Sequence, residues 1–205
     1  DEATVSRTLV ATANLQFFET YQSNEIGAQW SQASTISAQN EITEEDLSNT
    51  NPDSTKIEEE PKNLATLTGE TKDGKKGLAD LVQGSGNYSM GYVTAEDKGT
   101  VDAFLRRDDI IAVFPEDLRF MWSADLESIS TKTKEMAYTL YAIKVPTNGK
   151  AMVGGTDVKS ASTGFDQGSS LITVDLSMSQ LGAEKWGQMT SDNVGKVVAI
   201  TMDGV

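Results

Sequence analysis

The sequence predicts an α+β fold, because stretches of helical periodicity alternate with stretches of strand-like alternation. Residues 4–14 place apolar side chains on one helical face, and residues 15–21 then alternate as in a strand. Near the other end, residues 171–176 and 196–202 have the composition of strands and enclose a predicted helix over 179–190. This strand, helix, strand order predicts one half of a split β-α-β lobe, which the opening helix and strand would complete.

The middle of the chain predicts a second α+β region, inserted between the two parts of that lobe. Its predicted elements, in chain order, are a helix over 23–40, a strand over 88–92, a helix from about 96 to 107 capped by Asp108, and an antiparallel hairpin of 118–122 with 138–142. We therefore expect a base lobe formed by residues 1–21 and 150–205, and an inserted head formed by residues 22–149. Because the chain ends directly after a strand and the turn-like Asp203-Gly204, we expect the base lobe to be truncated.

An acidic segment lies inside the predicted head. Residues 41–62 hold eight acidic side chains against two lysines, few large apolar groups, and the breakers Pro52 and Pro61. This composition predicts a mobile surface loop.

The overall composition excludes several classes of function. The chain has 17 basic and 31 acidic residues, so its formal charge of −14 would repel nucleic acid and anionic lipid surfaces. It has neither Cys nor His, which removes thiolate nucleophiles, His-dependent triads and the usual zinc and haem ligands. We therefore expect no enzyme activity, no catalytic residue, no cofactor and no metal.

The motif-like strings in the sequence do not change this expectation. Residues 69–76 differ from a phosphate-binding loop by a lysine where a hydroxyl must reach Mg²⁺, so they predict a solvated turn. The acidic stretch at Asp46, Ser48, Thr50 and Asp53 lacks the Gly and the bidentate Glu of an EF-hand. Neighbouring carboxylates such as Asp108 and Asp109 occur by chance in so acidic a chain.

One set of large apolar residues is denser than the rest of the chain. Its members are Phe114, Leu118, Phe120, Met121 and Trp122. Such a set forms either part of a core or a partly exposed patch that holds an apolar polypeptide segment. The sequence leaves both interpretations open.

Several ordered strings resemble the first periplasmic domain of the SecD/SecDF family. The closest agreement is in Gly182–Thr190 followed by Asn193–Gly204, with its Asn-x-Gly-Lys turn and Ala-Ile-x-x-Asp-Gly strand. Leu9–Tyr21 resembles the family's helix leading into an apolar-Glu-Phe strand, in the form typical of fused SecDF proteins of Bacteroidetes-like bacteria. Leu140–Lys144 and Gly154–Ala161 fit as well, whereas residues 39–84 match nothing in the family's pattern.

The resemblance implies an accessory subunit of the Sec translocon on the periplasmic side of the bacterial inner membrane. It implies a ferredoxin-like base with an inserted head that holds emerging preprotein while proton flow drives export. The partners would be unfolded preprotein and the translocon channel subunits, and the membrane spans would lie outside this chain. Rotation of the head would take place at two chain crossings, near 21–24 and 146–154. Four residues suit a hinge at the second crossing: Pro146, Gly149, Gly154 and Gly155.

Two other functions remain as alternatives. A related proton-driven exporter of the RND type would share ferredoxin-like lobes but not the Asn-x-Gly-Lys and Ala-Ile-x-x-Asp-Gly strings. A hydrolase that uses carboxylates and a bound metal would need a cluster of buried acids.

Overall fold

The computed structural model describes residues 14–39, 76–84, 86–129, 135–165 and 172–202. The fold is α+β with antiparallel sheets, as the sequence predicts. The chain divides into two compact units: a central unit of residues 21–142, and a terminal unit of residues 1–20 and 143–205. The predicted helix over 4–14, the acidic segment 41–62 and most of the string 69–76 lie outside the described residues.

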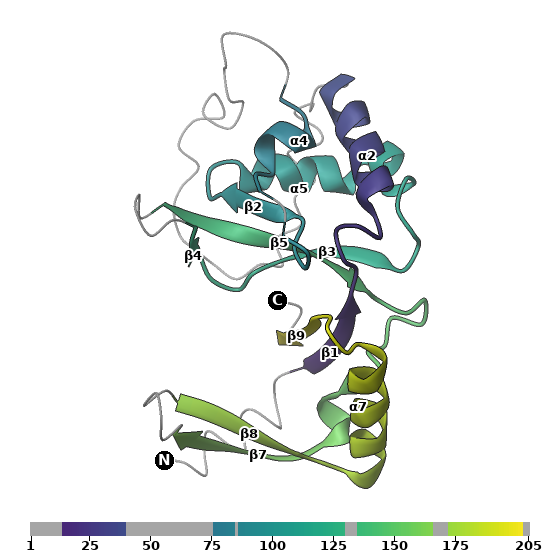
Figure 1. Cartoon of the computed structure of the whole chain (residues 1–205), viewed down its shortest axis with the longest axis vertical. Coiled ribbons are helices and arrows are strands. Elements are labelled where there is room, and N and C mark those ends of the chain that lie inside the picture. Colours follow the sequence, from purple (N-terminus) through teal and green to yellow (C-terminus); the bar gives the residue numbers. More distant parts are fainter. Residues whose placement is uncertain (1–13, 40–75, 85, 130–134, 166–171, 203–205) are drawn as a thin grey trace. The chain divides into compact units, whose positions relative to one another are not determined.

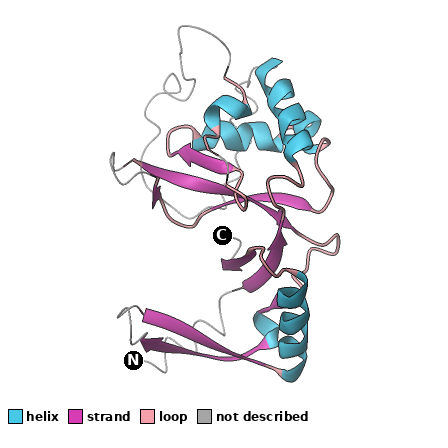
Figure 2. Cartoon of the chain, viewed as in Figure 1, coloured by secondary structure: helices cyan, strands magenta, loops and turns pink. Residues whose placement is uncertain are grey.

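The central unit places helices against a small antiparallel sheet. Its elements are α2 (Gly27–Gln39), α4 (Leu78–Leu81), β2 (Gly91–Thr94), α5 (Lys98–Arg106), α6 (Asp108–Ile111), β3 (Leu118–Trp122), β4 (Glu127–Ser128) and β5 (Met136–Lys144), whose last two residues belong to the terminal unit. Strand β5 pairs with β2, β3 and β4, so the predicted pairing of 118–122 with the following long strand is confirmed. Figure 2 shows the helices of this unit gathered on one side of its strands.

The core of the central unit forms between these helices and the sheet. The amphipathic α5 buries Val101 and Phe104, which pack with Leu78 of α4 and Leu140 of β5. The buried Ser37 hydroxyl of α2 accepts a hydrogen bond from the Leu78 N–H at 2.8 Å, which joins the two helices. Burial of these side chains is the main source of stability for the unit.

The start of β2 requires a glycine. Gly91 has φ +143°, a conformation that L side chains rarely adopt, and a Cβ there would lie 2.4 Å from the carbonyl oxygen of Gly84. This close approach lets Tyr92 exchange backbone hydrogen bonds with Gln83, at 2.9 and 3.0 Å. The segment that follows α4 is thereby held against β2.

The terminal unit is built around β1 (Leu15–Thr20). This strand pairs antiparallel with β9 (Val198–Met202), with β6 (Val153–Gly154) and with the last residues of β5. Helix α7 (Gln180–Asp192) covers one face, where the Phe17 and Trp186 rings meet edge to face with centroids 5.2 Å apart. Figure 1 shows the β7–β8 hairpin extending away from one end of α7; it is a separate two-stranded sheet of β7 (Val158–Phe165) and β8 (Ile172–Met178).

Three local predictions differ from the structure. Helix α2 begins at Gly27, because residues 22–25 form a turn in which the Gln22 N–H donates to the Glu25 carboxylate at 2.7 Å. Asp108 is the first residue of α6 and not a helix cap, since Arg107 holds the cap position between α5 and α6. Strand β2 begins at Gly91, later than the alternation over 88–92 predicts.

Candidate polypeptide-binding surfaces

Two of the five predicted binding residues lie in the core of the central unit. Phe114 and Leu118 are 9% and 5% exposed and pack with Ile110 and Leu140. Reaching them would require the unit to open, so for these two residues the core interpretation holds.

The aromatic residues of β3 are half-buried and held from several sides. The Phe120 ring meets Phe114 edge to face at 5.0 Å and Trp30 of α2 at 5.8 Å. The Trp122 ring lies 6.4 Å from that of Tyr138. These contacts fix β3 against α2 and β5, and both side chains stay partly exposed.

A charged pair completes the environment of Trp122. The indole Nε1–H donates to the Asp102 carboxylate at 2.8 Å, and the Lys98 ammonium lies 5.1 Å from the centre of the indole ring. The same ammonium is 3.4 Å from Asp102 and 5.5 Å from the centre of the Tyr138 ring. The hydrogen bond to Asp102 and the Lys98 ammonium therefore hold the Trp122 ring in place. A ring held in this way is suited to act as a rigid contact surface.

Met121 points to the opposite face of β3, beside the exposed Arg119. Its unbranched side chain is half-buried and adaptable. Of the five predicted residues, Phe120, Met121 and Trp122 are thus the ones that a polypeptide could touch.

The four predicted hinge residues all lie in the terminal unit. The boundary between the units falls between Ala142 and Ile143, inside β5. Gly149 has φ +68°, and its N–H closes a turn onto the Pro146 carbonyl oxygen at 2.7 Å. Gly154 pairs with β1, and Gly155 begins the short 3-10 helix η2 (Gly155–Asp157). These glycines therefore lie on the C-terminal side of the boundary inside β5. They belong to a turn, a strand pair and a short helix.

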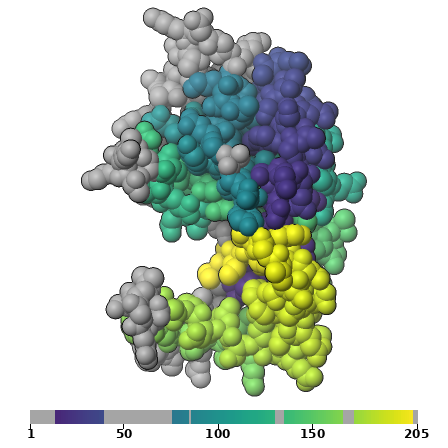
Figure 3. Space-filling model, in the orientation of Figure 1, coloured from purple at the N-terminus to yellow at the C-terminus, as the bar shows by residue number. Residues whose placement is uncertain are grey.

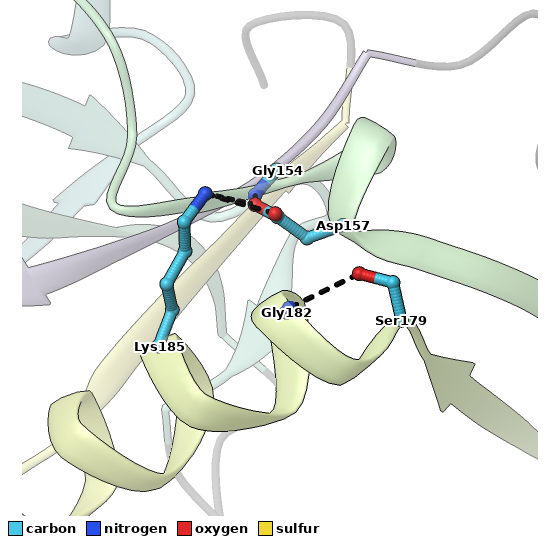
Figure 4. A network of polar contacts seen from close by, with 5 residues as sticks. All are labelled: Gly154, Asp157, Ser179, Gly182 and Lys185. Carbon is cyan, nitrogen blue, oxygen red and sulfur yellow. Dashed lines mark hydrogen bonds and ion pairs between the residues drawn. The ribbon is translucent and has the colours of Figure 1, made fainter.

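A polar network joins η2 to α7, and Figure 4 shows it from close by. The Lys185 ammonium lies 2.8 and 3.1 Å from the two carboxylate oxygens of Asp157, which is 6% exposed, and the Gly154 N–H donates to the same carboxylate at 3.0 Å. The hydrogen bond from Lys185 lowers the pKa of Asp157, against the opposing effect of its burial. At the start of α7, the Ser179 hydroxyl accepts the Gly182 N–H at 3.0 Å.

In this network the charges of Asp157 and Lys185 pair with each other, and the Ser179 hydroxyl caps α7. Sequence reasoning assigned no role to Asp157 or Lys185, which are 28 positions apart. Over the residues that the structure describes, Asp157 is the one buried acid, and no three acidic side chains gather as a metal site. The hydrolase alternative therefore has no supporting geometry in these ranges. No helix within them is long and apolar enough to cross a membrane.

Comparison with known proteins agrees with the resemblance seen in the sequence. Residues 131–205 match the family model described as SecDF, P1 head subdomain. The protein translocase subunit SecD of Rickettsia bellii is 41% identical over 54 residues, which are 26% of this chain and 10% of that protein. SecD of Rhodothermus marinus is 26% identical over 116 residues, which are 57% of this chain and 18% of that protein. No solved structure matches the chain.

These matches cover parts of longer proteins. The chain corresponds to less than a fifth of the length of either curated relative. The range of the family model crosses the boundary between the two units, so the division into base and head stays a prediction for this chain. The chain is thus similar, over parts of its length, to the SecDF P1 head subdomain and to SecD translocase subunits.

Proposed function

We propose that this chain is the extracytoplasmic segment of a Sec translocon accessory subunit, which binds emerging preprotein and assists export driven by the proton motive force. The observation that carries the proposal is the match of residues 131–205 to the SecDF P1 head subdomain, together with two relatives named as translocase subunits. The parent protein would sit in the bacterial inner membrane through spans outside this chain, with this segment on the periplasmic side. Its partners would be unfolded preprotein and the translocon channel subunits.

The physical character of the chain supports a holder of polypeptide and not a catalyst. A holder must bind many sequences weakly, which favours apolar, adaptable surfaces over a rigid pocket lined with polar groups. On the central unit, Met121 would offer an adaptable side chain on one face of β3, and the half-buried Phe120 and Trp122 would offer aromatic contacts on the other face, beside the buried Phe114 and Leu118. The ferredoxin-like base, the rotation of an inserted head and the fused SecDF form belong to this proposal as well.

Site-specific photo-crosslinking tests the proposal in the full-length protein in inner-membrane vesicles. A photoreactive residue at Met121 is expected to crosslink to a preprotein arrested during translocation, and the crosslink should weaken when the proton motive force completes export. Thr35, which is exposed on α2, is the matched control position in the same unit. Equal crosslinking from both positions would remove this surface, and no crosslink from any position in the chain would contradict preprotein binding.

A further inference from the structure

The β7–β8 hairpin has one apolar face that opens to solvent. Its strands pair from Phe165 opposite Ile172 to Val158 opposite Met178, and paired residues share a face. The apolar face therefore carries the following side chains: Val158, Ala161, Thr163, Phe165, Ile172, Val174, Leu176 and Met178. The other face carries serines, threonine, glycine and Asp175. Figure 3 shows the hairpin as a narrow projection from α7.

The apolar face is continuous with the core of the terminal unit at one end. Val158 and Met178 pack with that core beside α7. Farther along, Phe165 is 75% exposed, Ile172 is 71% exposed and Val174 is 51% exposed. Large side chains exposed in a row on a short hairpin are uncommon unless they serve binding.

Strand β8 also offers an unprotected edge. Within the described ranges, it pairs with β7 alone, so the backbone groups of its outer edge face no other strand. Its sequence contains no Pro and a single charge, at Asp175, and its register with β7 is regular from Ser160 onward. Proteins normally block such an edge with Pro, Lys, a bulge or a covering segment.

The exposed apolar area of this face indicates what kind of partner it can bind. Phe165, Ile172, Val174 and Leu176 together expose on the order of 400 Å². That is about half of the ~800 Å² that each partner contributes to a stable protein–protein interface. A second copy of the chain is therefore too large a partner for this surface alone. A single extended segment is of the right size, since the seven residues of β8 span about 23 Å.

We propose that β8 accepts a short, extended apolar segment of unfolded polypeptide as a third strand beside it. Backbone hydrogen bonds to the outer edge would bind the segment whatever its sequence, and the apolar face would favour apolar side chains at alternate positions. This inference rests on the proposed function, and it names a binding surface on the terminal unit, separate from the one at Met121.

Two variants and two peptides test the inference with the whole chain. The probe is a dye-labelled heptapeptide of alternating Val and Thr, and its partner carries N-methyl groups on alternate backbone nitrogens, which remove hydrogen-bond donors. Val174→Lys places a charge on the apolar face, whereas Ser177→Lys places the same charge on the exposed polar face of the same strand. Because both positions are exposed, both variants are expected to keep the fold, which circular dichroism checks.

Weak binding, in the micromolar to millimolar range, is expected for the unmodified peptide. We expect Val174→Lys to weaken it at least about tenfold, Ser177→Lys to change it by no more than about twofold, and N-methylation to abolish it. Equal effects of the two substitutions, or undiminished binding of the N-methylated peptide, would overturn the inference. So would self-association of the chain that Val174→Lys removes.

The crosslinking experiment separates this inference from the proposed function. If the peptide binds but ignores Val174→Lys while Met121 crosslinks to preprotein, the inference fails and the proposed function stands. If neither the peptide nor the preprotein contacts the chain, both fail.

Discussion

Replacing Gly182 by Ala tests the packing of α7 against η2. A Cβ at this position would lie 2.5 Å from the carbonyl oxygen of Asp157 and 2.8 Å from its Cβ. The first of these distances is 0.9 Å short of the 3.4 Å at which ordinary contact begins. The Asp157 backbone cannot easily yield, because its carbonyl accepts the Ser179 N–H at 2.8 Å and its side chain holds Lys185. The first turn of α7 must therefore move.

The expected cost follows from two opposing effects. Overpacking against fixed backbone costs about 3 kcal/mol, at the upper end of the usual range. Replacing Gly by Ala within a helix returns up to about 1 kcal/mol. Gly182→Ala should thus destabilise the terminal unit by roughly 2 kcal/mol. Gly187→Ala is the matched control on the same helix, since nothing lies within 4 Å of its added Cβ, and it should stabilise by up to about 1 kcal/mol.

Native-state hydrogen exchange of the α7 amides measures this difference. A loss of 2 kcal/mol corresponds to roughly 30-fold faster exchange of the most protected amides. Gly187→Ala should slow the same amides or leave them unchanged. If Gly182→Ala proves as stable as Gly187→Ala, the close packing of α7 on Asp157 is refuted.

Two further predictions concern ionisable groups. Asp157→Asn should destabilise the terminal unit by about 1–3 kcal/mol at pH 7. Because Lys185 lowers the folded-state pKa of Asp157, this stabilisation is complete above the ordinary carboxyl value of about 3.9 and is lost as the pH falls through the lower folded value. Thermal unfolding from pH 7 to 2 should show the variant and the wild type converging, and a constant gap would contradict the assignment. Burial and a 2.7 Å hydrogen bond to the Asp117 carboxylate raise the pKa of the Tyr21 hydroxyl. Asp117→Asn should therefore lower the pKa of Tyr21, as followed by NMR during a titration. An unchanged pKa of Tyr21 would rule out Asp117 as a cause of its shift.

The elements that the sequence predicted best are those with strong local signals. The α7 helix follows Ser179, whose hydroxyl caps it, and β9 is a run of β-branched and apolar residues. Periodicity alone missed β7, because residues 158–165 are largely polar and small and take up a strand conformation by pairing with β8. Such a strand depends on its partner more than on its own composition.

The candidate surfaces also combine features with a local signal in the sequence and features that depend on contacts between distant residues. The density of large apolar side chains at 114–122 was visible in the sequence, but which of them were buried depended on contacts with α2 and α5. The ion pair of Asp157 and Lys185 joins segments 28 positions apart and carries no local signal. The apolar face of the hairpin became recognisable only once the register of β7 with β8 assigned each residue to a side.

The three tryptophans are distributed so that each unit has its own optical reporter. Trp186 is the single indole of the terminal unit and lies against Phe17, whereas Trp30 and Trp122 belong to the central unit. A chain with Phe at positions 30 and 122 would emit from the terminal unit alone, and a chain with Phe at position 186 from the central unit alone. Coincident denaturation midpoints of the two emissions would mean that the halves of this domain unfold as one cooperative body, and separate midpoints would give the stability of each.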